Sequence, residues 1–118
     1  DFPSFYSRSS GFRSPLRLDG PDEVAATMRA KWGLGLAGGL VIANPIPVAD
    51  EIPEAEISLL ITRAIHEAAE LGISGAAITP YLLGRIVELS DGESLRANIA
   101  LVKNNAALGA QIAVAYAG

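Results

Sequence analysis

The sequence predicts an α/β fold in which helices cover a sheet, and two patterns indicate it. Apolar residues recur at helical spacing in several stretches after residue 19, and one short run, Gly39–Asn44 (GLVIAN), is apolar on both faces. Such a run is typical of a strand buried in a helix-covered sheet. One strand cannot make a sheet, so we expect a segment of a layered domain whose sheet is completed by a missing N-terminal part.

Length and composition limit the kinds of protein that this chain can be. Its 118 residues, 50% of them hydrophobic, can form one small core but not two ordinary domains. No apolar run is long enough to cross a bilayer, and a net charge of −4 argues against a nucleic-acid surface. The lack of cysteine excludes disulfides and thiolate chemistry. We therefore expect residues 1–118 to be a single segment of one soluble, cytoplasmic protein.

The first 18 residues should form a loop, because they contain two prolines and five serines and have no sustained period. They carry three arginines against one aspartate, whereas the rest of the chain is acidic. This loop is therefore the natural place for an anion, although exposed arginines more often form an ordinary solvated surface. Residues 19–118 should contain the helices and the one buried strand.

The stretch Asp19–Glu23 has the features of a helix start, with an early proline and acidic residues in the first turn, and the helix should continue to about Trp32. The glycines in Gly33–Gly38 match the G-x-G-x-x-G dinucleotide pattern. However, a helix precedes them and the Gly39–Asn44 run follows, which reverses the order that pyrophosphate binding requires. We interpret them as a helix stop and turn.

Two further helices should follow the predicted strand. Glu54–Leu71 has nearly ideal helical spacing and ends at Gly72, and Thr79 and Pro80 should cap a helix over Tyr81–Leu89. The single histidine, His66, lies on the polar face of the first of these helices. Without a second histidine or a cysteine nearby, it should be a surface residue rather than a metal ligand or general base.

The last predicted helix carries amides on its apolar side. At about 100° per residue, Asn98 and Asn105 lie within roughly 20° of each other among apolar neighbours, whereas Lys103 and Asn104 lie on the polar side. A buried amide without a partner costs on the order of 1–3 kcal/mol. The partner is either loop backbone and buried water or a bound polar molecule, and composition does not separate these two possibilities.

Several long motifs resemble one family. FPSFYSRSSGF near the start, the run ending in ANPIP, and SLRANIALVKNNA in the last helix are similar, in this order, to the C-terminal part of the pseudouridine-5′-phosphate glycosidases, which include the indigoidine synthase A-like proteins. The resemblance covers the whole chain. It implies a manganese-dependent, trimeric enzyme with an α/β/α core. Such an enzyme reversibly splits the C–C glycosidic bond of pseudouridine 5′-phosphate into ribose 5-phosphate and uracil.

The resemblance also implies where the chemistry lies. A C-glycoside has no leaving-group oxygen to protonate, and the family is understood to open the ribose ring and form a Schiff base on a lysine, which acts as the electron sink. That lysine, the acidic proton donor and the metal-binding aspartate lie upstream of the segment matched here. We therefore expect no catalytic residue and no metal ligand in this chain, with Mn²⁺ held elsewhere, and expect the segment alone to be inactive.

For substrate binding, the resemblance places the last helix beside the site. The expected substrate-binding residues are Asn98, Asn105, Arg8, Ser9 and Ser10, and the secondary candidates are Lys103, Asn104 and Asn44, the last because it ends the predicted strand. An amide can donate to and accept from uracil at once, and hydroxyl and guanidinium groups bind phosphate. The expected partners are the N-terminal part of the same protein and further copies in a trimer. The alternative is a non-catalytic oligomerising or ligand-binding module of the same fold.

Overall fold

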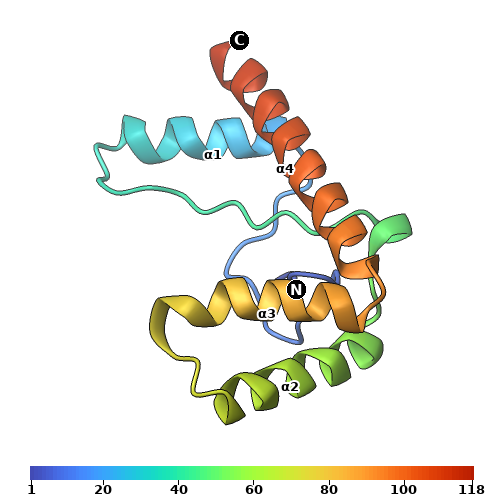
Figure 1. Ribbon diagram of the computed structural model, residues 1–118. Coiled ribbons are helices and arrows are strands. Elements are labelled where there is room, and N and C mark those ends of the chain that lie inside the picture. The colour runs from blue at the N-terminus through green and yellow to red at the C-terminus, as the bar shows by residue number, and fades with distance from the viewer.

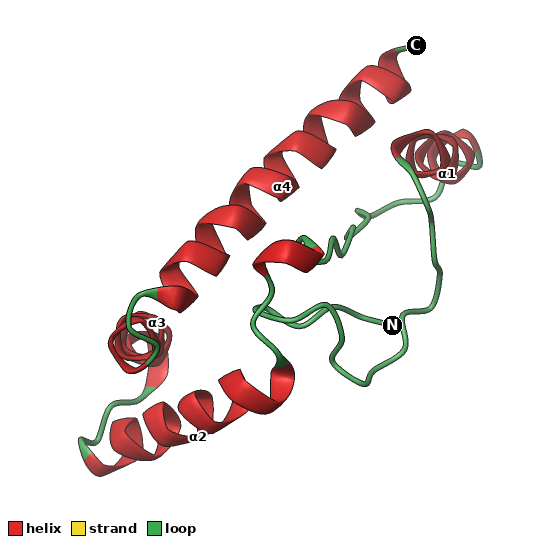
Figure 2. Cartoon of the chain, turned by 90° about the vertical axis from the view of Figure 1, so that its right-hand side faces the viewer, coloured by secondary structure: helices red, strands yellow, loops and turns green.

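The computed structural model describes all 118 residues as an elongated arrangement of helices, with principal extents of 51 × 31 × 23 Å. Four α-helices are joined by loops and two short 3₁₀ turns, and no strand is present (Figure 1). The helices α2 and α3 lie side by side, and the long α4 extends from the end of α3 to α1, where the C-terminus lies (Figures 1 and 2). None of the helices has the length and apolarity needed to cross a bilayer.

Helix α1 spans Pro21–Gly33, as the sequence predicts. Its proline occupies the first turn, where a backbone N–H would have no partner, and Asp22 and Glu23 face the positive end of the helix dipole. The glycines after it form a turn and not a nucleotide-binding loop. Gly35 and Gly38 adopt φ values of +72° and +90°, a left-handed conformation that glycine adopts at little cost.

The strand predicted at Gly39–Asn44 is not formed within this chain. The segment is an extended loop whose backbone makes no hydrogen bond within the chain, and Val41 is 90% exposed. The physical reason is the absence of a partner, because an isolated extended segment gains no ladder hydrogen bonds. The predicted sheet is therefore not present among these 118 residues.

Helices α2 (Glu54–Glu70) and α3 (Ile78–Leu89) pack against each other. Helix α2 ends as predicted at Gly72, which has a φ of +68°; its N–H and that of Ile73 donate to the carbonyls of Ala69 and Ala68.

The prediction that Thr79 caps α3 is wrong, because Thr79 lies inside the first turn of the helix and Ala77 occupies the cap position. A 3₁₀ turn at Gly75–Ala77 leads into α3, so the helix already begins at Ile78 and Pro80 still lies in its first turn.

Helix α4 is the longest element, Glu93–Ala117, and begins after a left-handed Gly92. Only one side of it packs within this chain, and its buried residues are Ser94, Ala97 and Leu101. The sequence pattern places two apolar residues beside Asn98. These residues, Ile99 and Val102, remain 47% and 58% exposed. The helix therefore has a second apolar face that nothing in this chain covers.

A small core lies where α2, α3 and the start of α4 meet the N-terminal loop. Its members are Tyr6, Ile46, Ile52, Ile57, Ala64, Ile86, Ala97 and Leu101. Only 13 of the 118 residues are buried, which is few for a chain that is half hydrophobic. Much of the apolar surface thus remains available to other parts of a larger structure.

Candidate functional site

Two adjacent amides of α4 contact the last residue of the extended segment and the proline that follows it. Asn104 Nδ2 donates to the carbonyl oxygen of Pro45 at 3.2 Å, and Asn44 Nδ2 donates to Asn105 Oδ1 at 3.0 Å. The amides of this helix therefore hold a loop that is about 60 residues away in sequence. The two amides that the sequence analysis placed at the centre of the apolar side do not contact loop backbone here: Asn105 accepts from the Asn44 side chain, and it is Asn104 that meets a backbone carbonyl.

Arg8 holds the same loop from the opposite end of the sequence. Its Nη1 donates to the carbonyl oxygen of Ile46 at 2.7 Å, and its backbone N–H donates to Glu51 Oε2 at 2.9 Å. Ile46 itself is completely buried. Three consecutive residues, here called the Asn44–Ile46 segment, are thus each hydrogen-bonded to a side chain of a distant element.

The two predicted serines face the N-terminal loop itself. The hydroxyl of Ser9 donates to the carboxylate of Asp1, and the hydroxyl of Ser10 donates to the carbonyl oxygen of Phe2. Ser9 is exposed and Ser10 is half-buried in this chain, and their contacts close the loop on itself. Their predicted role on the phosphate side of a substrate stays a prediction.

Asn98 and Lys103 are not brought into this network. Asn98 is half-buried and its side chain makes no hydrogen bond within the chain, and Lys103 is exposed. The predicted placement of Asn104 on the polar side is wrong, because Asn104 is half-buried on the side of α4 that packs. The spacing of Ala97, Leu101, Asn104 and Leu108 (i, i+4, i+7, i+11) is the signal that would have placed it there.

A cavity of about 360 Å³ lies beside the Asn44–Ile46 segment. It is lined by the start of the chain, the loop before α1, the first turns of α1, residues 40–45 and one side chain of α4. Among all the sequence-predicted site residues, Asn44 alone lines it. Two carboxylates, Asp1 and Asp19, also line the cavity, and no arginine, lysine or histidine does.

The core beneath the N-terminal loop contains polar groups that the sequence analysis missed. Ser7 donates its hydroxyl to the carbonyl of Ile52 at 2.5 Å, and the N–H of Ile52 donates to the carbonyl of Tyr6 at 2.9 Å. Burial raises the pKa of the Tyr6 phenol, and the neighbouring Ser94 hydroxyl opposes the rise more weakly. The Ser94 Oγ is buried without a well-formed hydrogen bond. Glu51, which accepts from Arg8, has no periodic signal in the sequence.

No group of three or more histidine, cysteine or acidic residues in this chain could hold a metal ion. The residues present therefore do not fit the Mn²⁺ that the resemblance implies. The arrangement offers neutral amides beside a cavity, which suits recognition of a neutral polar group rather than proton transfer.

These features define a helical segment in which amide side chains of α4 hold the Asn44–Ile46 segment, next to an extended stretch of backbone that has no partner in this chain. Its sequence matches the model of the family described as indigoidine synthase A-like protein over residues 1–115. The chain belongs to the indigoidine synthase A-like family.

Curated relatives carry a more specific name. The chain is 63% identical over 118 residues to a pseudouridine-5′-phosphate glycosidase of a Nocardioides species, covering 100% of this chain and 38% of that protein. It is 57% identical over 117 residues to one of Methylobacterium nodulans, covering 99% and 35%. The chain therefore spans little more than a third of the length of these relatives.

The fold also matches a solved structure. An indigoidine synthase A-like protein from Thermotoga maritima superposes with a TM-score of 0.83 at 38% identity, over 97% of this chain and 37% of that one. The likeness extends through nearly all of the chain, so the arrangement of these helices is that of the family.

Proposed function

We propose that this chain is the C-terminal part of a pseudouridine-5′-phosphate glycosidase. The whole enzyme would reversibly cleave the C–C glycosidic bond of pseudouridine 5′-phosphate to ribose 5-phosphate and uracil. The observation that carries the proposal is 63% identity across the entire chain to a relative of that name. Within the enzyme, the chain would supply binding groups at the substrate and would not supply the nucleophile.

The two lysines of the chain support this division of roles. A lysine that forms a Schiff base must be uncharged when it attacks, and a desolvated pocket or a neighbouring cation usually provides that. Lys103 is exposed, and Lys31 is half-buried with its Nζ donating to the carbonyl of Ala37 at 2.6 Å. Neither has the environment of a nucleophile, so the reacting lysine would come from outside these 118 residues.

The properties of the extended Gly39–Asn44 segment favour the proposal that the rest of the enzyme completes a sheet around it. It is apolar on both faces, its backbone groups are unpaired, and prolines follow it directly. Buried backbone groups require hydrogen-bond partners, and neighbouring strands provide them most economically. In the proposal, this segment is one strand of an α/β/α core and the helices of this chain cover that sheet.

The substrate-binding residues of the proposal are those on α4 and in the N-terminal loop. They are Asn98, Asn105, Arg8, Ser9 and Ser10, with Asn44, Asn104 and Lys103 as secondary members. The Mn²⁺ ion, the trimer and the cytoplasmic location of the proposal rest on the family resemblance. The metal ligands would lie outside this chain.

A direct assay tests the proposed function. The full-length enzyme, meaning a polypeptide of the relatives' length that carries these 118 residues, is mixed with pseudouridine 5′-phosphate and Mn²⁺, and uracil is quantified. We expect uracil and ribose 5-phosphate in equal amounts, and none from the 118-residue chain alone. A correctly folded full-length protein that releases no uracil would contradict the proposal and leave the non-catalytic module as the better description.

A further inference from the structure

The Asn44–Ile46 segment is held more firmly than its extended neighbours. Residues 39–43 have no backbone hydrogen bond in the chain, whereas each of the next three residues has a side-chain partner from α4 or the N-terminal loop. Two of those bonds end on main-chain carbonyl oxygens, which fixes the path of the backbone and therefore the direction of the Asn44 side chain.

Asn44 keeps hydrogen-bonding capacity that no other group of this chain uses. Its carboxamide has two N–H donors and one carbonyl oxygen, and the contact with Asn105 Oδ1 uses one donor. One N–H and the carbonyl oxygen remain, which is the donor and acceptor pair that an imide or amide edge requires. Asn44 lines the cavity and Asn105 does not, so the N–H and carbonyl oxygen that can meet a molecule in the cavity are those of Asn44.

The charge of the cavity limits what can approach this edge. Asp1 and Asp19 line it and no basic residue of the chain does, so these walls disfavour a phosphate group. The extended segment contributes apolar side chains such as Leu40 and Ile42 to the same cavity. Apolar walls around one neutral amide favour a flat, uncharged, polar ring.

We propose that Asn44 is the residue that contacts the uracil ring, and that Asn104 and Arg8 are positioning residues that act through the carbonyl oxygens of Pro45 and Ile46. The assignment rests on the proposed function and specifies which end of the substrate this part of the site binds. Asn105 orients the Asn44 carboxamide. The ribose and phosphate lie toward groups outside this cavity.

The test measures each substrate of the reverse reaction separately in the full-length enzyme. In Asn44→Ala, the KM for uracil should rise about tenfold, since two neutral hydrogen bonds are lost, while the KM for ribose 5-phosphate changes less than about twofold. Asn44→Asp is the isosteric second variant. It keeps the shape but removes the N–H donors, and it should also raise the KM for uracil. Circular dichroism and gel filtration establish that each variant is folded.

The positioning residues are tested in double variants, in which each substitution is combined with Asn44→Ala. Asn104→Ala and Arg8→Met should each raise the KM for uracil severalfold in the normal enzyme, but should add little in the Asn44→Ala background, because they act through that residue. Matched controls are Gln111→Ala, an exposed amide on the same helix, and Arg13→Met, an exposed arginine in the same loop. Both controls should leave the KM for uracil unchanged.

The outcomes separate this inference from the proposed function. If the normal enzyme makes no uracil, the proposed function fails. If the enzyme is active and Asn44→Ala leaves the KM for uracil unchanged, or raises both KM values equally, the assignment of Asn44 is overturned. Full additivity of Asn104→Ala or Arg8→Met with Asn44→Ala would remove their role as positioning residues.

Discussion

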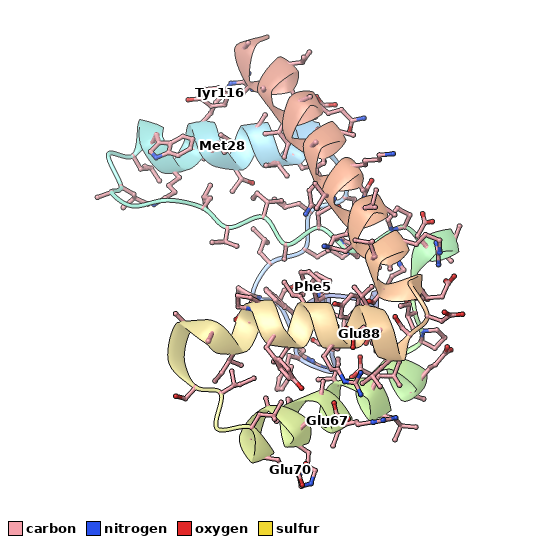
Figure 3. All side chains as sticks on the ribbon, in the orientation of Figure 1. Phe5, Met28, Glu67, Glu70, Glu88 and Tyr116 are labelled. Atoms are coloured by element: carbon pink, nitrogen blue, oxygen red, sulfur yellow. The ribbon has the colours of Figure 1, made fainter.

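Arg85 Nε on α3 lies 2.5 Å from Glu67 Oε2 on α2, and this ion pair joins the two helices. The same guanidinium also contacts the second oxygen of Glu67 at 3.2 Å and Glu88 Oε2 at 2.8 Å. Arg63 reaches Glu67 from the preceding turn of α2. Figure 3 shows the Glu67 and Glu88 side chains in this region, on α2 and α3 respectively.

The pair makes stability depend on pH in a defined direction. The hydrogen bond from Arg85 lowers the pKa of Glu67 from 4.5 to about 2. A carboxylate whose pKa is lowered on folding stabilises the folded state at every pH above its pKa in the unfolded chain. This contribution is lost as the pH falls from about 4.5 toward 2. Glu67→Gln should therefore lower the urea midpoint at neutral pH, and the difference from the unsubstituted chain should shrink through that window.

Glu88→Gln provides the comparison for the same measurement. Glu88 is 69% exposed in its side chain and makes one contact with Arg85, so its replacement should have a smaller effect. Equal urea midpoints for the unsubstituted chain and Glu67→Gln at neutral pH would contradict the structural role of the pair.

Arg29 should stabilise the end of α4. Its Nη2 donates to the carbonyl oxygens of Ala115 and Tyr116 at 2.7 Å each, and its guanidinium lies 5.4 Å from the centre of the Tyr116 ring. A cation that satisfies the last carbonyls of a helix also complements the helix dipole. Figure 3 shows Tyr116 near the end of α4, beside α1. Arg29→Met should lower the free energy of unfolding by about 1–2 kcal/mol in urea titrations.

The matched control is Arg17→Met. Arg17 forms its ion pair with Asp19 on the surface, with its side chain 83% exposed, so its loss should change stability by less than about 0.5 kcal/mol. A similar small change for Arg29→Met would show that the contacts with α4 do not stabilise the fold.

Two glycines should respond to alanine in opposite directions. Gly92 has a φ of +83° before α4, so Gly92→Ala should destabilise the chain by about 1 kcal/mol. Gly84 lies inside α3 with open space around its Cβ position, and Gly84→Ala should stabilise the chain by about 0.5–1 kcal/mol. Thermal unfolding of both variants measures the difference, and a shift of the same sign in both would refute the conformational argument.

The extended Gly39–Asn44 segment should change its hydrogen exchange with context. In the 118-residue chain its amides have no partner and should exchange at nearly unprotected rates, whereas the full-length enzyme should protect them strongly. Amides inside α2 serve as the internal reference in both samples. Rapid exchange of the segment in a folded full-length enzyme would remove it from the proposed sheet.

The positions of the helices could be predicted from the sequence because their signals are local. Proline and acidic residues mark the start of α1, and the apolar period of α2 ends at Gly72, where a left-handed turn stops the helix. The surface position of His66 also follows from its helical face, and the structure confirms it with the side chain 74% exposed and near Glu70. Each of these features depends only on residues within a few positions along the chain, so the sequence is sufficient to predict it.

The contacts of the amides could not be predicted in the same way. The apolar stripe of α4 suggested that Asn98 and Asn105 lie at its centre, but part of that stripe, including Ile99 and Val102, is exposed in this chain. The side that packs is rotated toward Asn104. A helix with two apolar faces does not indicate from its own sequence which face meets which partner.

By itself, the sequence determined the family, the helices and the residue types available for binding, because these depend on composition, spacing and long shared motifs. The tertiary structure decided that Gly39–Asn44 has no strand partner within this chain, and that Asn104, Asn105 and Arg8 converge on three consecutive residues. Pairing and convergence join residues that are distant in sequence. Their geometry is therefore set by how the helices and loops pack and not by any local pattern.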